Sequence, residues 1–168
     1  MPGARPVSWR RCGINPATLY RALKFLHVLS ATLAFGASLT YGAWTLRGVR
    51  DSAHEGFVLR GLLWLDRWLV NPAFTVAGLS GIALVRLGGL PWGLLWVRAS
   101  LALFLFTTAL SWAVYRPLAR RQWDRFSAAG SADPHYRRLS LWAARLGLVF
   151  TLANLGLLAL MVFQPAGL

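Results

Sequence analysis

Four long apolar segments are the feature that most constrains the fold of this chain. They cover about residues 19–46, 67–87, 92–115 and 139–163. A helix needs about 20 mostly apolar residues to cross the roughly 30 Å hydrocarbon core of a bilayer. Backbone polar groups in that core must be paired within the protein, which favours helices over irregular chain. We therefore predict an all-α polytopic membrane protein with four transmembrane helices in an antiparallel bundle.

The composition supports a membrane protein over a soluble or nucleic-acid-binding one. Of the 168 residues, 57% are hydrophobic and 14% are charged, whereas soluble domains carry about 25% charged residues. The formal net charge of +13 comes from arginines that flank the apolar segments and line no polar face. Basic residues in such positions interact with anionic lipid headgroups. The predicted partner is thus the lipid bilayer, and nucleic acid is excluded.

The connections between the apolar segments define a single domain. Residues 17–165 form this domain, and residues 1–16 are expected to be a flexible basic N-terminal arm. The segment 47–67 is charged and predicted to be partly helical along the membrane surface. Residues 87–93 read "LGGLPWG", a tight Gly/Pro turn that makes the second and third spans a hairpin. The segment 116–138 is the most basic connection.

The distribution of basic residues predicts the orientation of the bundle. The two long connections hold ten arginines, and the opposite side holds six basic residues. The positive-inside rule places the more basic side in the cytoplasm. We therefore expect a bacterial inner-membrane protein with both termini outside the cytoplasm. The ten are Arg47, Arg50, Arg60, Arg67, Arg116, Arg120, Arg121, Arg125, Arg137 and Arg138, and the six are Arg5, Arg10, Arg11, Arg21, Lys24 and Arg86.

Small residues recur at helical spacing and predict the packing faces. Lipid tails are as apolar as leucine, so transmembrane helices pack through small side chains. We expect these stripes to pack the bundle, and they also suit a homo-oligomer or a larger membrane complex. The predicted packing residues are Ser30, Ala34, Ser38 and Gly42 in the first span, Ala77 and Gly81 in the second, and Gly147 and Thr151 in the fourth.

Charged residues near the ends of spans allow one ion pair. Asp66 begins the second span, and Arg145 lies two turns into the fourth from the same side, so an Asp66–Arg145 pair is geometrically allowed. Arg98 lies about 10 Å into the third span and can extend its charged end to the outer surface. Asn71-Pro72 marks either the start of a helix or a kink.

Several short strings resemble a known family. They are "LKFLHVLSA" in the first span, "AGLSGIAL" at 77–84, "YRPLARR" at 115–121, "LSLWAARLG" at 139–147 and "ALMVFQP" at 159–165. In this order they resemble a bacterial family of small, predicted integral membrane proteins with four spans and no assigned function. The resemblance covers about residues 19–165. That family tends to have Lys before the closing Pro, where this chain has Gln164.

The first span is also similar to two other groups of membrane proteins. The string "LKFLHVLSATLAFGASLTYGAWTLR" is similar to the opening span of the copper-resistance inner-membrane proteins and of the haem-binding membrane protoporphyrinogen oxidases. Both groups open with an apolar helix that carries Lys and, three residues later, His. The resemblance implies that His27 occupies a position where relatives bind haem or a metal.

The topology restricts what His27 can bind. His54 and His135 are assigned to the opposite side of a roughly 30 Å core, so a bis-histidine haem within one subunit is excluded. Met161 lies near the end of the fourth span at a depth similar to that of His27, and the two form the axial pair that the topology permits for haem b. The alternative is that His27 makes a hydrogen bond to a carbonyl, a hydroxyl or water.

Three functions are open from the sequence. One is a non-catalytic membrane component, such as an accessory subunit of a larger respiratory or transport assembly. The second is a haem- or metal-binding redox protein that uses His27. The third is a small transporter or proton pathway. No catalytic residue is predicted, and three histidines on two sides of a membrane do not make a zinc site. The residues of the third hypothesis are Asp66, Arg98, Arg145 and Asn154.

Overall fold

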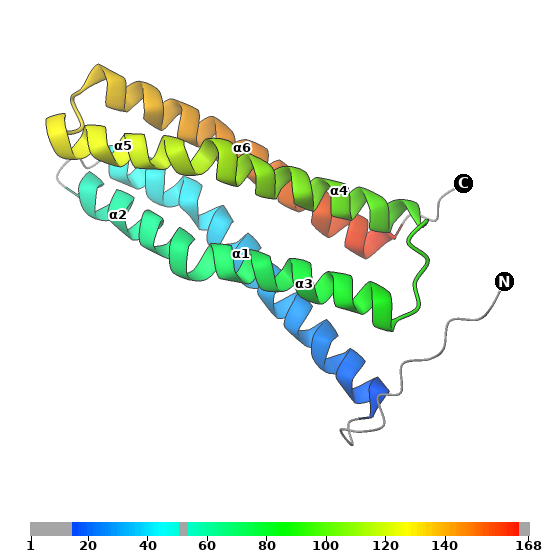
Figure 1. The fold of residues 1–168 in the computed structure, drawn as a ribbon. Coiled ribbons are helices and arrows are strands. Elements are labelled where there is room, and N and C mark those ends of the chain that lie inside the picture. The colour runs from blue at the N-terminus through cyan, green and yellow to red at the C-terminus, as the bar shows by residue number, and fades with distance from the viewer. Residues whose placement is uncertain (1–14, 51–53, 165–168) are drawn as a thin grey trace.

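The described residues form four long helical rods in one antiparallel bundle (Figure 1). The computed structural model describes residues 15–50 and 54–164. All four rods are long and apolar enough to cross a membrane, which confirms the predicted all-α polytopic fold. In chain order the elements are α1 (Pro16–Arg50), α2 (Glu55–Leu65), the π-helical turn η2 (Asp66–Val70), α3 (Asn71–Leu87), α4 (Leu95–Leu110), the π-helical turn η3 (Ser111–Tyr115), α5 (Arg116–Ala129) and α6 (Pro134–Phe163).

The helices run well beyond the predicted spans at one end of the bundle. Helix α2 continues through η2 into α3, and α4 continues through η3 into α5. The two long connections predicted from the sequence are therefore largely helical. We call this end, which carries α2, α5 and the first turns of α6, the α2–α5 end. The opposite end carries the turn between α3 and α4, and it is also where α1 begins and α6 ends (Figure 1). Most of the predicted N-terminal arm, residues 1–14, lies outside the described residues.

Two prolines explain the π-helical turns. Pro72 and Pro117 each lie two residues after such a turn. Proline has no N–H, and its ring collides with the carbonyl four residues earlier in a regular α-helix. A π-turn takes in one extra residue and makes room for the ring without ending the helix. Asn71-Pro72 thus begins α3 directly after a π-turn, inside a rod that continues from α2.

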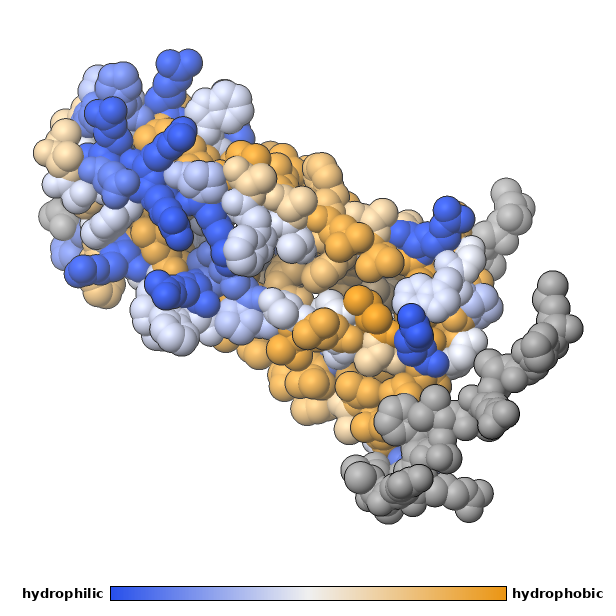
Figure 2. All heavy atoms as spheres, in the orientation of Figure 1, coloured by the Kyte–Doolittle hydropathy of each residue, from blue (hydrophilic) through white to orange (hydrophobic). Residues whose placement is uncertain are grey.

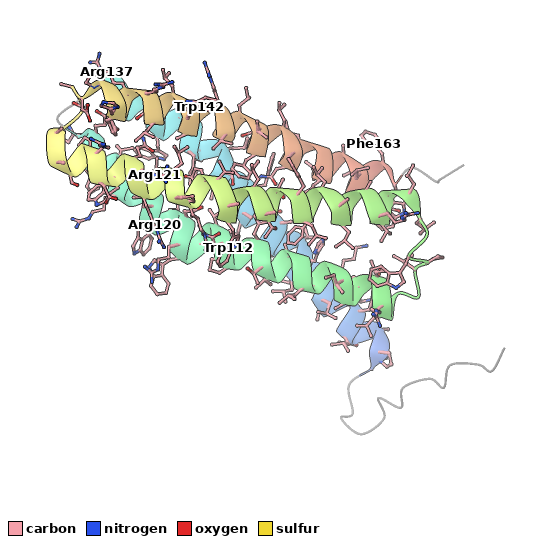
Figure 3. All side chains as sticks on the ribbon, turned by 45° about the horizontal axis from the view of Figure 1, so that its top comes forward. Trp112, Arg120, Arg121, Arg137, Trp142 and Phe163 are labelled. Atoms are coloured by element: carbon pink, nitrogen blue, oxygen red, sulfur yellow. The ribbon has the colours of Figure 1, made fainter. Side chains whose placement is uncertain are left out.

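The surface divides into a hydrophilic end and an apolar band. Figure 2 shows hydrophilic side chains gathered over the α2–α5 end and hydrophobic ones over most of the remaining length of the bundle. Arginines lie over tryptophan rings at both edges of the band, as is typical of membrane interfaces. These Arg–Trp pairs are Arg116–Trp112 and Arg145–Trp142 at one edge and Arg86–Trp92 at the other. About 32 Å of helix separates Trp142 from Phe163 (Figure 3), close to the thickness of a hydrocarbon core.

The interior of the bundle is small and polar. Seven of the fourteen buried residues in the described chain are polar or charged, and no described side chain is fully enclosed. Ser30 and Ala34, with 5% and 2% of their surface exposed, lie on the face of α1 that packs inward. Gly78 of α3 faces the ring of Phe104, and Gly156 of α6 faces Leu103, where a Cβ would lie 3.4 Å away. Close approach at small residues therefore holds the rods together.

The predicted packing residues do not all lie at helix contacts. Ser38 is half-buried and donates to the Ala34 carbonyl at 2.7 Å. Gly147 is exposed, with nothing within 4 Å of an added Cβ, and Thr151 donates to its carbonyl at 2.9 Å within α6. The surroundings of Gly42 lie outside the described residues.

We predict that Ala34→Leu lowers the thermal stability of the detergent-solubilised protein. Ala34 is 2% exposed, and adding three carbons to a filled helix contact costs about 1–3 kcal/mol. The measurement is the midpoint of thermal unfolding followed by tryptophan fluorescence. Ala31→Leu is the matched control, because Ala31 is exposed on the same helix. Equal effects of the two changes would show that α1 does not pack through this face.

Candidate functional site

A cavity of about 490 Å³ lies inside the bundle, between residues of all four rods. It extends from Glu55 and Tyr136 near the α2–α5 end to Asn154 on α6. Tyr136 and Asn154 are about 27 Å apart along α6, and Asn154 is about 14 Å from Phe163. Given a hydrocarbon core of about 30 Å, the cavity reaches the middle of the apolar band.

The charge of the cavity wall is opposite to that of the whole chain. Two of the five acidic residues, Glu55 and Asp66, line the cavity, and none of the lining residues is Lys or Arg. The remaining wall combines hydroxyl and amide groups with aromatic rings and aliphatic side chains. In a chain of net charge +13, this mostly apolar wall carries acidic groups and no basic ones. Its polar residues are Ser38, Tyr41, Asn71, Thr75, Thr107, Thr108, Ser111, Tyr115, Gln122, Tyr136, Ser140, Thr151 and Asn154.

Two hydrogen bonds between helices form a polar layer at the α2–α5 end of the cavity. The Tyr136 hydroxyl donates to Glu55 Oε1 at 2.7 Å, which ties α6 to α2. Gln122 Nε2 donates to Ser140 Oγ at 2.9 Å, which ties α5 to α6. Glu55, Gln122 and Tyr136 are all buried. Hydrogen bonds to a buried carboxylate are stronger than neutral ones, so this layer links the rods where they leave the apolar band.

Asp66 lies in the π-turn η2, with its side chain on the cavity wall. Asn71 holds it by donating to Asp66 Oδ2 at 2.9 Å and to the Asp66 carbonyl at 2.7 Å. The structure does not bring Asp66 to Arg145. Arg145 is exposed, and its guanidinium lies 5.3 Å from the ring centre of Trp142. The carboxylate thus faces inward while the arginine faces the membrane interface.

Asn154 is the polar residue of the cavity wall farthest along α6 from the α2–α5 end, and its amide differs from the other polar groups in its hydrogen bonding. It is 7% exposed and lines the cavity, yet its amide makes no hydrogen bond with any residue in the described part of the chain. The nearby hydroxyls of Thr107 and Thr151 instead donate to carbonyls of their own helices. A buried amide without a partner costs free energy. Asn154 therefore retains the capacity to bind a ligand or water.

His27 bonds to α3 outside this cavity. Its Nδ1 lies 2.8 Å from the Ala77 carbonyl and 3.3 Å from Ser80 Oγ. The Ala77 carbonyl can only accept, so the proton between it and His27 belongs to Nδ1, and Ser80 Oγ donates to the Val76 carbonyl at 2.6 Å. The absence of a side chain on Gly81 admits the imidazole, since an added Cβ would lie 3.0 Å from Cε1. His27 thus makes the carbonyl and hydroxyl contacts that the sequence left open, and it links α1 to α3.

The residues do not fit the haem pair of His27 and Met161. Met161 is 36% exposed near the end of α6, and the first half of α1 diverges from that end in both views (Figures 1 and 3). The Cε1 edge of the imidazole faces Gly81 on the neighbouring helix. Among residues 15–50 and 54–164, no three His, Cys, Asp or Glu side chains are grouped so that they could hold a metal ion. Arg98 is exposed near the start of α4, and it does not line the cavity.

Sequence reasoning missed the cavity because its residues are spread over eight elements. Glu55, Gln122 and Tyr136 lie in predicted connections, and Asp66 was expected to pair with Arg145. One pattern could have found the face that α6 turns to the cavity. Tyr136, Ser140, Gly147, Thr151 and Asn154 recur at intervals of three, four or seven residues, which places them on one side of a helix.

One comparison with known proteins gives a match. The model of a family described as "Predicted integral membrane protein (DUF2269)" matches residues 21–165, a range that includes every residue of the cavity wall. This confirms the resemblance to a family of small integral membrane proteins. Neither the curated proteins nor the solved structures give a match. The likeness to copper-resistance and haem-binding proteins is not shown by these comparisons.

We predict that Tyr136→Phe destabilises the protein by about 1.5–3 kcal/mol, because it leaves the buried Glu55 carboxylate without its donor. The readout is the free energy of unfolding in detergent. Tyr20→Phe is the matched control, since the Tyr20 hydroxyl makes no hydrogen bond with a described residue. A double-mutant cycle with Glu55→Gln should give a coupling energy above about 0.5 kcal/mol. Additive effects would show that the two side chains do not interact.

Proposed function

The chain belongs to the family of integral membrane proteins whose model it matches, and on that premise we propose that it is a small transporter that binds an organic cation inside its bundle. The observation that carries this proposal is the cavity of about 490 Å³ with two carboxylates and no basic residue in its wall. Ionisable residues inside a membrane bundle commonly belong to a substrate or ion pathway. The cavity also lies within the roughly 300–1,000 Å³ range of small-molecule sites.

The chemistry of the wall favours a cation that also carries apolar groups. Asp66 supplies a negative charge that interacts electrostatically with Arg116 but forms no ion pair with an arginine of the described residues, and Asn71 donates to only one of its two carboxylate oxygens. The rings of Phe74, Phe104 and Tyr115 line the same space, and aromatic faces attract cations. Asn154, which is 7% exposed, adds an amide at the deep end that makes no hydrogen bond with another described residue. An organic cation would use all three kinds of group.

Buried polar residues continue beyond the cavity toward the other end of the bundle. They lie on inward faces of α1, α3 and α4, and the Ser100 hydroxyl has no partner in the described chain. Such groups are costly in an apolar bundle, so their alignment supports a path across the bundle. They are Ser30, Ser80 and Ser100, each at most 5% exposed, and half-buried His27.

The charge distribution supports an orientation for this path. The ten arginines of the two long connections lie at the α2–α5 end. By the positive-inside rule this end faces the cytoplasm of a bacterial inner membrane, and both termini lie outside. The Glu55–Tyr136 layer would then close the cytoplasmic side of the cavity, and Asn154 would lie near the membrane centre.

The cavity supports a transporter over the non-catalytic role that the sequence favours. The prediction of an accessory subunit depended on the lack of any convergent polar set, and the cavity wall is such a set. The small-residue stripes also give no separate support for a homo-oligomer or a larger assembly. Ser30 and Ala34 are buried within the single chain, and Gly81 lies against His27.

We expect tetraphenylphosphonium to raise the thermal unfolding midpoint of the detergent-solubilised protein, because the cation pairs with Asp66 and its rings contact aromatic residues of the wall. Asp66→Asn should weaken this binding at least tenfold, as loss of a buried charge partner does. Tetraphenylborate has the same shape and the opposite charge, so it controls for apolar partitioning. Asp124→Asn is the matched control variant, since Asp124 is exposed on α5.

Two results would overturn the organic-cation proposal. One is equal stabilisation by tetraphenylphosphonium and tetraphenylborate, which would show that charge does not contribute. The other is full binding of the cation by Asp66→Asn. Uptake of tetraphenylphosphonium into proteoliposomes that contain the wild type, and not into those with Asp66→Asn, would separate transport from binding alone.

Asn154→Leu should stabilise the protein and weaken binding of tetraphenylphosphonium. Leucine removes a buried amide that has no partner in the described chain, and relieving that cost is worth about 1–3 kcal/mol. Opposite changes in the unfolding midpoint and in affinity are typical of a residue kept for function. A lower midpoint for Asn154→Leu would show instead that the amide supports the fold.

A further inference from the structure

We propose that the groove between α5 and the start of α6 binds the headgroup of a phospholipid that carries two phosphates. This groove is separate from the internal cavity, and the proposal does not depend on the transport function. It encloses about 610 Å³ on the outer surface of the α2–α5 end. Its lining residues are Arg121, Arg125, His135, Arg138, Leu139 and Trp142.

The helices place the basic groups in register across the groove. Arg121 and Arg125 are one turn apart on α5, and His135 and Arg138 are one turn apart on α6, so each pair lies on one helix face. Contacts on the inner side keep the two helices together: Gln122 bonds to Ser140 at 2.9 Å, and the rings of Phe126 and Tyr136 are 5.3 Å apart. The width of the groove is therefore set by contacts between residues outside its lining, so substitutions in the lining leave these contacts in place.

The positive charge of the groove is not neutralised within the described chain. Arg121, Arg125 and Arg138 are exposed, and no carboxylate of a described residue forms an ion pair with them. No acidic residue lines the groove. Guanidinium groups bind phosphate oxygens through paired, charge-assisted hydrogen bonds. Three arginines and a histidine exceed what one singly charged phosphate needs, so a ligand with two phosphates fits the site better.

The position of the groove identifies a lipid as the source of the phosphates. Its lower wall is Leu139 and Trp142, and Trp142 is 51% exposed at the edge of the apolar band. The neighbouring Leu141 is 63% exposed on the lipid-facing surface. Figure 3 shows Arg121 and Trp142 on the two adjacent helices, and Figure 2 shows this end as the hydrophilic one. A headgroup would contact the arginines while its acyl chains run down the apolar surface.

The test compares two double variants of the full chain that lose the same charge. Arg121→Gln/Arg138→Gln removes one arginine from each wall of the groove. Arg120→Gln/Arg137→Gln removes the adjacent arginines, which do not line it. Binding of cardiolipin, with two phosphates, and of phosphatidylglycerol, with one, is measured by native mass spectrometry of the detergent-solubilised protein. Circular dichroism checks that helix content is unchanged in both variants.

We expect the groove variant to bind cardiolipin about 30-fold more weakly than the wild type, from two lost contacts, and the control variant to stay within about threefold. Wild type should prefer cardiolipin over phosphatidylglycerol, and millimolar inorganic phosphate should not displace it. Equal losses in the two variants would overturn the site in favour of general charge attraction. Equal binding of the two lipids would overturn the two-phosphate assignment. Displacement by inorganic phosphate would overturn the lipid assignment.

Discussion

Helices in a bilayer gain little by bringing apolar side chains together, because the lipid around them is just as apolar. The rest of this structure depends on that constraint. Large apolar residues such as Phe57, Leu79 and Phe163 are exposed, and half of the buried residues in the described chain are polar or charged. Specific contacts then have to hold the rods together. His27 to the Ala77 carbonyl and Tyr136 to Glu55 are two of them, and each joins helices that are distant in the sequence.

The same constraint makes an open cavity with polar groups in its wall an argument for a bound ligand. A bundle that packs through small residues could close completely, yet this one keeps about 490 Å³ open along its axis. The two π-turns contribute to the opening, since η2 places Asp66 and η3 places Ser111 and Tyr115 on its wall. Polar groups that face such a space in an apolar environment cost stability. Their presence on this wall, above all that of Asn154, supports the proposed binding of a ligand.

Comparison with the sequence predictions shows which features are local. The presence of four spanning helices was predicted correctly, because a run of about 20 apolar residues is sufficient to identify each one. Helical spacing places Ser30 and Ala34 on one face, and both are buried. The connection 47–67 was predicted to be only partly helical and no helix was predicted over 116–138, because α5 is rich in arginine and both α2 and α5 are held by contacts with other elements. An example is Gly56 of α2, which lies against the ring of Phe126 of α5.

The sequence by itself determined the class of the molecule: an all-α membrane protein with four spans, whose two long connections carry most of the basic charge. Hydropathy and charge are properties of continuous segments, so no tertiary information was needed. Only the tertiary structure decided which polar residues meet. The π-turn at Asp66 directs its carboxylate inward, away from Arg145. The first half of α1, which includes His27, diverges from the end of α6 (Figure 1). Rotation and tilt of each helix arise from packing against its neighbours, which a single segment does not encode.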